Sequence, residues 1–236
     1  MSDRERLFFF FGGYKKRKKT ARRMSSSFFS KPARRTTLDP IYFLFPQVLS
    51  PVECRHLIHL AHQKGFHEST VITETQLDGQ QPKSRKSKTC WIHYTTDTVI
   101  HRLYSWVESL TGYSKNELED LQIVKYDPDG YFRQHFDQCE VDSSASCKDN
   151  TMERGHRVYT LLLYLNDGFE GGETTFLHYG HKVRGNIGDA LIFPNVFFDE
   201  ASETYQIEPR SLHEGNSVTS GTKYIANIWI RHRLSS

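Results

Sequence analysis

The sequence contains no paired cysteine motif. Its four cysteines are Cys54, Cys90, Cys139 and Cys147. None of them forms a C-x-x-C pair, which argues against a zinc ribbon. Cys139 and Cys147 can close a small disulfide in an oxidising compartment, and two free thiols are an equal alternative.

Long apolar runs are also missing, so no transmembrane helix is expected. The phenylalanine cluster at residues 8–11 is short and is followed by basic residues. A secretory signal has a longer apolar core with its positive charge in front. We therefore expect no secretory signal and favour the cytoplasm or the nucleus. The endoplasmic reticulum or another organelle is the alternative if the N-terminal segment is a targeting sequence.

The chain does have an uneven distribution of charge. Residues 1–36 hold twelve of the 31 Lys and Arg but only two of the 28 Asp and Glu, so this segment carries +10 and the remainder −7. We predict a disordered basic extension over residues 1–36 and one folded domain over residues 37–236, with its core motifs at 120–232. The extension is a nuclear-localisation signal, a nucleic-acid contact, part of a transit peptide or a solvated tail.

Helix signals come first in the folded part and strand signals follow. Ser50, Pro51 and Glu53 open a helix that Gly65 can end, and a second helix is predicted from Asp97 to about residue 110. The segments 138–155 and 197–209 are interpreted as loops. The predicted fold is α+β and mainly β, with helices on one face of an antiparallel sheet or sandwich. Strands are predicted at about 41–45, 121–126, 131–137, 157–165, 173–177, 182–184, 190–193 and 223–230.

His135 and Asp137 are the first candidate metal ligands. They lie on one face of a predicted strand, and Phe136 between them lies on the other face. An imidazole and a carboxylate are therefore side by side on a rigid element. An H-x-D pair alone is a weak signal, because such pairs are common on strand surfaces. A third ligand is needed to complete a metal site.

His213 is the candidate for that ligand. It precedes an alternating segment in which Lys223, Asn227 and Trp229 share one face. A lysine within apolar alternation has to reach solvent or meet an anion. If His213 closes the triangle, Lys223 lies beside the metal and can hold the carboxylate of a chelating ligand. Two histidines and one carboxylate with open positions are typical of non-haem Fe(II) oxygenases, although ligand count alone also fits catalytic zinc.

The ordered set of motifs resembles the Fe(II)- and 2-oxoglutarate-dependent dioxygenases of the prolyl 4-hydroxylase type. The resemblance covers most of residues 41–232. It rests on His135-x-Asp137, His213 and Lys223, and on the following stretches: Ser84 to Ser87 and Trp91 as R-x-S, Tyr126 with Gly130-Tyr131 as the lead-in to H-x-D, Arg157 to Asp167 as R-x-x-T-x-L-x-Y-L-N-D, Glu170 to Thr174 as E-G-G-x-T, and Gly188 to Phe193 as G-x-A-L-x-F.

This resemblance implies a double-stranded β-helix, or jelly-roll, core with bracing N-terminal helices. It also implies that His135, Asp137 and His213 hold Fe(II), and that Lys223 pairs with the distal carboxylate of 2-oxoglutarate. Tyr126, Thr160 and Tyr164 are expected to assist at the cosubstrate, with core packing as their alternative. The implied reaction consumes O2 and 2-oxoglutarate and gives succinate, CO2 and a hydroxylated substrate, with ascorbate as the expected reductant.

The resemblance leaves the substrate open. The expected partner is a protein or peptide that contains proline. A second reading is nucleic-acid demethylation, with nucleic acid bound through the basic extension. The lysine anchor disfavours it, because that family uses arginine there. A third reading is a non-catalytic binding domain, which the intact ligand set disfavours. The chain shows no peptide-binding repeat domain of the kind that collagen hydroxylases carry, and the sequence does not indicate an oligomeric state.

Overall fold

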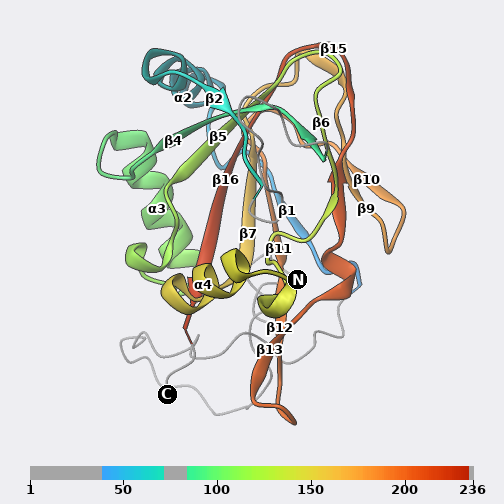
Figure 1. Ribbon diagram of the computed structural model, residues 1–236. Helices are drawn as coiled ribbons and strands as arrows, with labels where there is room; N and C mark the ends of the chain where they lie inside the picture. Colours follow the sequence, from blue (N-terminus) through green and yellow to red (C-terminus); the bar gives the residue numbers. More distant parts are fainter. Residues whose placement is uncertain (1–38, 72–83, 234–236) are drawn as a thin grey trace, which may run out of the picture.

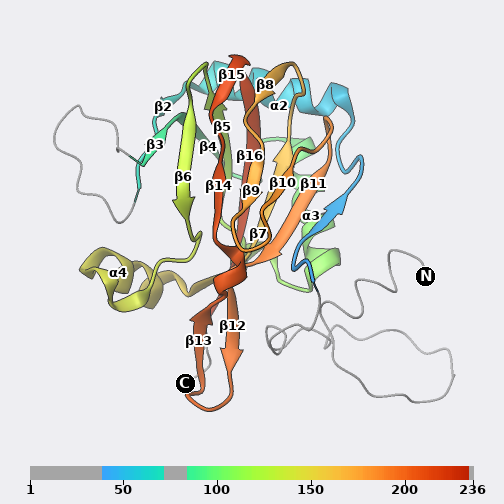
Figure 2. The same ribbon diagram turned by 90° about the vertical axis from the view of Figure 1, so that its right-hand side faces the viewer.

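The fold is seen in a computed structural model that describes residues 39–71 and 84–233. The predicted extension at 1–36 lies outside these residues. Two antiparallel sheets face each other as a jelly-roll, which is the mainly β fold that was predicted (Figures 1 and 2). No helix within the described residues is long and apolar enough to cross a bilayer.

The larger sheet has seven strands and the smaller sheet has five. The larger is ordered β1 (Phe43–Phe45), β11 (Ala190–Pro194), β7 (His156–Tyr164), β16 (Lys223–His232), β5 (Leu121–Tyr126), β4 (Lys88–Ile92) and β2 (His67–Glu68). The smaller is ordered β10 (His181–Val183), β9 (Thr174–Phe176), β14 (His213–Gly215), β6 (Tyr131–His135) and β3 (Arg85–Lys86). Two further pairs are β12 (Val196–Asp199) with β13 (Thr204–Ile207), and β8 (Phe169–Gly171) with β15 (Val218–Gly221).

Helices α2 (Pro51–Lys64) and α3 (Thr98–Thr111) cover the outer face of the larger sheet. The predicted capping box of α2 is confirmed, because the Ser50 side chain accepts from Glu53 N while Glu53 binds the Ser50 backbone. The predicted cap of α3 is also confirmed, since Asp97 accepts from the first backbone N–H groups of that helix. These helices therefore begin where the sequence predicts.

Apolar side chains form two clusters, one on each face of the larger sheet. The outer cluster joins α2 and α3 to the sheet through residues such as Leu57, Leu103 and Ile228. The inner cluster lies between the two sheets and includes Phe176, Phe193 and Tyr164. The outer cluster braces the larger sheet, and the inner cluster surrounds the space in which the predicted site residues meet.

Two segments that were predicted as loops are ordered elements. Within 138–155 the chain forms a short 3-10 turn, η2 (Val141–Ser143), and helix α4 (Ala145–Arg154). Within 197–209 it forms most of the β12–β13 hairpin, followed by the 3-10 turn η3 (Pro209–Ser211). A third 3-10 turn within the described residues, η1 (Lys115–Glu117), follows Ser114. The loop predictions were wrong because polar and acidic residues hide both elements from a periodicity reading.

Gly188 joins the start of the motif strand β11 to the chain ahead of α2. Its φ is +89°, and a Cβ built there would lie 1.9 Å from the carbonyl oxygen of Leu49. The backbone of Leu49 is held against Gly188, since Leu49 N donates to the carbonyl oxygen of Gly188 at 3.1 Å. Only glycine fits this close backbone approach.

We predict that Gly188→Ala destabilises the protein by about 2 kcal/mol or more, because it adds both left-handed strain and a backbone clash. Gly168→Ala is the matched control, since a Cβ there meets nothing within 4 Å. Urea unfolding of both variants measures the difference. Equal unfolding midpoints for the two variants would contradict the requirement for glycine at position 188.

Candidate active site

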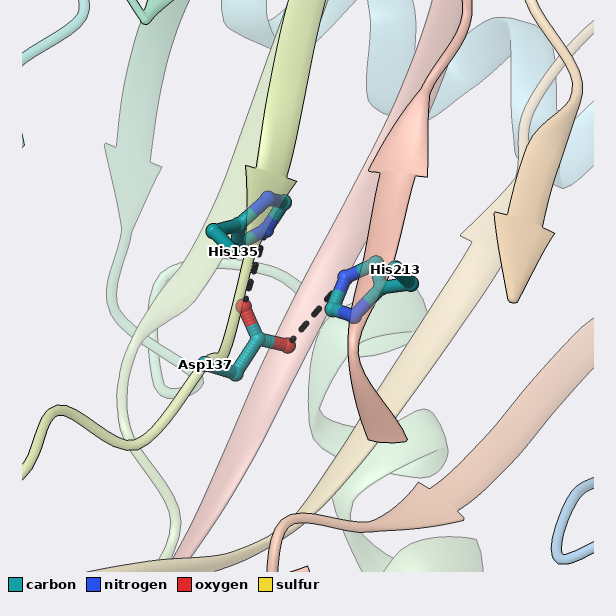
Figure 3. A group of neighbouring side chains, drawn as sticks. All are labelled: His135, Asp137 and His213. Carbon is teal, nitrogen blue, oxygen red and sulfur yellow. Dashed lines mark ion pairs between the residues drawn. The ribbon is translucent and has the colours of Figure 1, made fainter. Parts of the chain in front are cut away.

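His135, Asp137 and His213 converge between the two sheets (Figure 3). Strand β14 pairs with β6 so that His213 lies directly opposite His135. His135 Nε2 is 3.5 Å from Asp137 Oδ1, and His213 Nε2 is 4.0 Å from Asp137 Oδ2. One nitrogen or oxygen from each residue lies within 4.8 Å of the others. Strand β6 ends at His135, so the predicted strand of 131–137 was two residues too long and Asp137 lies just beyond the observed strand.

The second ring nitrogen of each histidine is held by the backbone. His135 Nδ1 lies 2.8 Å from the carbonyl oxygen of Arg133, and His213 Nδ1 lies 2.9 Å from that of Ser211. A carbonyl can only accept, so in the neutral rings Nδ1 carries the proton and Nε2 carries the lone pair. Both lone pairs are therefore placed on the side of Asp137, as in metal-binding histidines.

Asp137 is held as a carboxylate. Burial alone would raise its pKa, but the two facing histidines, in their protonated forms, and the Thr160 hydroxyl lower it well below the usual range. The Thr160 hydroxyl also donates to Asp137 Oδ2 at 2.6 Å and accepts from the Asn195 amide at 2.9 Å. Thr160 thus orients a candidate ligand. Its predicted part in cosubstrate binding stays a prediction.

His213 is the most deeply buried of the three, with 6% of its side chain exposed. Burial and the neighbouring His135 lower its pKa to about 4. His213 is therefore neutral at physiological pH, which is the form that can bind a metal ion. Two imidazoles and one carboxylate, each oriented by an outer hydrogen bond, fit a divalent first-row metal such as Fe(II).

Lys223 is buried in the same space with 2% of its surface exposed. Its ammonium donates to the carbonyl oxygen of Gly172 at 2.6 Å and lies 5.2 Å from the centre of the Tyr126 ring. Among the described residues it forms no salt bridge, and burial lowers its pKa to about 8. A buried ammonium that lacks a carboxylate partner favours binding of an anion.

The glycine pair of the predicted E-G-G-x-T turn explains the contact between Lys223 and the carbonyl oxygen of Gly172. Gly171 and Gly172 have φ values of +69° and +67°. A Cβ on Gly172 would lie 3.1 Å from Cδ of Lys223. The two left-handed residues let the turn pass close to the lysine and present a carbonyl to it.

One pocket connects these groups and has about 420 Å³ free of protein atoms, including its open mouth. The predicted residues His135, Asp137, His213, Lys223 and Tyr126 all line it. Leu162, Ile225 and Phe132 supply apolar walls. The three candidate ligands and Lys223 therefore share one pocket.

Tyr164 does not line this pocket. Its hydroxyl donates to Thr174 Oγ1 at 3.4 Å and to the carbonyl of Val183 at 3.3 Å, within the inner apolar cluster. Thr174 does line the pocket, so Tyr164 lies one residue behind it. A direct role for Tyr164 at the cosubstrate stays a prediction.

The remaining polar lining residues were not predicted as site residues: Arg85, Gln122, Thr174, Asn227 and Trp229. The sequence held a signal for several of them. Arg85 and Thr174 lie in the quoted motifs, and Asn227 and Trp229 share the alternating face of Lys223. Gln122 gave no local signal, because its position depends on cross-strand pairing.

A buried charge network supports the wall beside Asp137. Glu119 pairs with Arg157 at 2.6 Å and with Arg231 at 2.7 Å. Arg157 also donates to the carbonyl oxygen of Asp137 and stacks on Trp229, 3.8 Å from the ring centre. Burial would raise the pKa of Glu119, but Arg157, Arg231 and the more distant Arg154 lower it to about 2. The network ties the ligand segment to strands β7 and β16.

The segment after Asp137 is cross-linked. Cys139 and Cys147 form a disulfide, so the structure contains the first of the two alternatives given for them. Gln138 is buried between this segment and β7. Its amide donates to the carbonyl of Cys139 at 2.7 Å and accepts from Arg157 N at 2.8 Å. Helix α4 is thereby fixed next to the candidate ligand.

Comparison with known proteins agrees with this geometry. Residues 121–231 match the model of the 2OG-Fe(II) oxygenase superfamily. A putative prolyl 4-hydroxylase of Acanthamoeba polyphaga mimivirus is 33% identical over 194 residues, which cover 82% of this chain and 75% of the relative. The chain belongs to the prolyl 4-hydroxylase family.

Two further relatives agree with this membership. Prolyl 4-hydroxylase subunit alpha-2 of Caenorhabditis elegans is 29% identical over 83% of this chain, but the match spans only 35% of that subunit. The crystal structure of a viral collagen prolyl hydroxylase from Paramecium Bursaria Chlorella virus-1, in its 2OG complex, has a TM-score of 0.61 and 28% identity, covering 83% of this chain and 98% of that one.

We predict that the Glu119 network makes stability depend on pH. The folded pKa of about 2 lies below the ordinary value of 4.5, so this stability is present above pH 4.5 and is lost as the pH falls toward 2. Between pH 6 and pH 2 the wild type should lose about 3 kcal/mol more than Glu119→Gln. Denaturant titrations across this range, with exposed Glu140→Gln as the control, measure the difference. Parallel curves for wild type and Glu119→Gln would contradict the network's role.

Proposed function

We propose that this chain is a Fe(II)- and 2-oxoglutarate-dependent dioxygenase that hydroxylates proline residues in a protein or peptide. The observation that carries the proposal is the placement of buried Lys223 in the same pocket as His135, Asp137 and His213. A cation beside a three-ligand metal site suits a cosubstrate that chelates the metal at one end and carries a carboxylate at the other.

His135, Asp137 and His213 would hold the iron through their Nε2 and carboxylate atoms. Bound Fe(II) supplies the coupled oxidation in which 2-oxoglutarate and O2 give succinate and CO2 while a substrate C–H bond is hydroxylated. Ascorbate is the proposed reductant that maintains the ferrous state. Thr160 and the two backbone carbonyls fix the ligands, so that the protein supplies a ready geometry.

Lys223 would bind the distal carboxylate of 2-oxoglutarate. Tyr126, directly opposite Lys223 in the strand register, would line the same end of the pocket. Leu162 and Ile225 would exclude water from the middle of the pocket. No side chain is required to act as an acid or base at the substrate carbon, because the cofactor carries the bond-breaking chemistry.

The substrate proposal rests on the relatives. Each of those described is named as a prolyl 4-hydroxylase or a collagen prolyl hydroxylase. For this chain we propose a proline-containing protein or peptide and do not specify collagen. Nothing in the described residues favours nucleic acid, since the basic segment at 1–36 lies outside them. The Cys139–Cys147 disulfide favours an oxidising compartment, such as the endoplasmic reticulum, over the cytoplasm or nucleus.

The direct test measures succinate released from 2-oxoglutarate with Fe(II), ascorbate, O2 and proline-rich peptides. We expect peptide-stimulated succinate together with a gain of one oxygen atom on the peptide, placed on proline by hydroxyproline analysis. His135→Ala should abolish both, because the metal site loses a ligand. Peptide-independent turnover that His135→Ala removes would show a sound site and a wrong substrate. No turnover by the iron-loaded wild type would favour a binding domain.

Lys223 gives a separate prediction. Its pKa of about 8 means that it loses its charge as the pH rises through 8. An anion binds the charged form, so the affinity for 2-oxoglutarate should fall by about tenfold per pH unit above pH 8. Calorimetric titration of the Mn(II)-loaded protein with 2-oxoglutarate measures this dependence.

Lys223→Met is the partner variant for that titration. It should weaken 2-oxoglutarate binding at pH 7 and abolish the pH dependence, while Mn(II) binding persists. Leu44→Ala, a half-exposed residue on β1 at the far edge of the sheet, serves as the control. An unchanged pH profile in Lys223→Met would rule out the lysine as the anchor.

A further inference from the structure

Asn195 is the single residue between β11 and β12, at the point where the chain leaves the larger sheet for the β12–β13 hairpin (Figure 2). It is fully buried and lies outside the pocket lining. Its side chain nevertheless reaches the site, because the amide is hydrogen-bonded to Thr160. Asn195 therefore lies one side chain behind the candidate ligand Asp137.

The hydrogen bonds that lead from Asn195 to Asp137 have a fixed direction. The Asp137 carboxylate can only accept, so the Thr160 hydroxyl uses its one proton toward Asp137 Oδ2 at 2.6 Å. Thr160 Oγ1 then has to accept, and Asn195 Nδ2 donates to it at 2.9 Å. Asn195 Oδ1 also lies 3.2 Å from Thr160 Oγ1, but the carboxylate is closer and charged, so it keeps the proton.

The two linking side chains are closed to water. Asn195 is 0% exposed and Thr160 is 1% exposed. Consecutive hydrogen bonds strengthen one another where water is excluded, and no solvent molecule can replace a missing partner there. If the Asn195 amide were lost, the Thr160 hydroxyl would be free to turn away from Asp137. The amide is therefore the group that fixes the direction of the Thr160 hydroxyl.

The backbone of Asn195 leads to a second candidate ligand, His213. The carbonyl oxygen of Asn195 accepts from Glu208 N at 2.9 Å. The carbonyl oxygen of Glu208 accepts from the Ser211 hydroxyl at 2.7 Å, and that of Ser211 accepts from His213 Nδ1 at 2.9 Å. The root of the hairpin is thus connected to Asp137 through a side chain and to His213 through the backbone. Such a position is suited to holding the two ligands in one arrangement.

We propose that Asn195 is a positioning residue of the candidate metal site. Its side-chain amide orients the Thr160 hydroxyl, and through that hydroxyl the Asp137 carboxylate, for a divalent metal ion. This inference rests on the proposed function, because it concerns the metal site that the function requires. Loss of an outer hydrogen bond to a metal ligand typically lowers metal affinity by about ten- to a hundredfold.

The test is a double-variant cycle in which calorimetry measures Mn(II) binding to Asn195→Leu, Thr160→Val and the combined variant. Leucine is close to asparagine in size, and the substitution leaves both backbone hydrogen bonds of residue 195 in place. We expect Thr160→Val to weaken Mn(II) binding by about ten- to a hundredfold and Asn195→Leu by about tenfold. The combined variant should bind no more weakly than Thr160→Val alone, because Asn195 acts through the hydroxyl.

Two controls separate positioning from a general structural effect. Thr160→Ser keeps the hydroxyl, so it should retain the wild-type Mn(II) affinity, and adding Asn195→Leu to it should again weaken binding by about tenfold. Thr111→Val removes a fully buried hydroxyl that donates to a backbone carbonyl within α3, so it should leave Mn(II) affinity unchanged. Urea unfolding of the metal-free variants shows that each is folded. Asn195→Ala, with the same expected result, replaces Asn195→Leu if that variant does not fold.

The outcomes also separate this inference from the proposed function. Wild-type Mn(II) affinity in Asn195→Leu, or losses that simply multiply in the combined variant, would overturn the positioning role and leave the proposed function standing. The expected cycle in a protein that does not hydroxylate proline-containing peptides would support the positioning role and refute the substrate proposal. A wild type that does not bind Mn(II) would overturn both.

Discussion

Burial of charge inside an apolar sandwich is the constraint on which this site depends. Asp137 accepts a hydrogen bond from the Thr160 hydroxyl and faces two imidazoles, and Glu119 pairs with three arginines. Lys223 differs, because among the described residues its ammonium forms no salt bridge and meets a backbone carbonyl and the Tyr126 ring. The pocket thus holds a buried ammonium without a carboxylate partner, which favours binding of a carboxylate. The surrounding apolar cluster gives that attraction its strength, since it keeps water away.

The two sheets carry different residues of the site. The smaller sheet carries His135 and His213 on neighbouring strands, with Asp137 just beyond one of them. The larger sheet carries Lys223 and Thr160 and is braced from behind by α2 and α3. The candidate metal ligands and the proposed anion anchor therefore face each other across the sandwich. Their separation is set by the packing of the two sheets, which is more rigid than a loop would be.

Local patterns predicted the elements and most of the site, whereas pairing between distant segments supplied the rest. The alternation around Lys223 placed Asn227 and Trp229 on its face, and all three line the pocket. Gln122 had no such signal, because its neighbours come from strands far away in sequence. Helix α4 was missed for a similar reason. Its sequence is polar, and it is fixed by a Ser144 cap and a disulfide rather than by an apolar stripe.

The direct pairing of His213 with His135 also bears on when the candidate ligands come together during folding. Strand β14 has three residues and is held between β6 and β9, so it cannot keep its place until both neighbours are formed. Contacts between such distant segments form late in folding, after the loop between them has closed. The unfolded chain therefore has no preformed cluster of ligands. A metal ion held by these three residues would therefore stabilise the folded chain over the unfolded one.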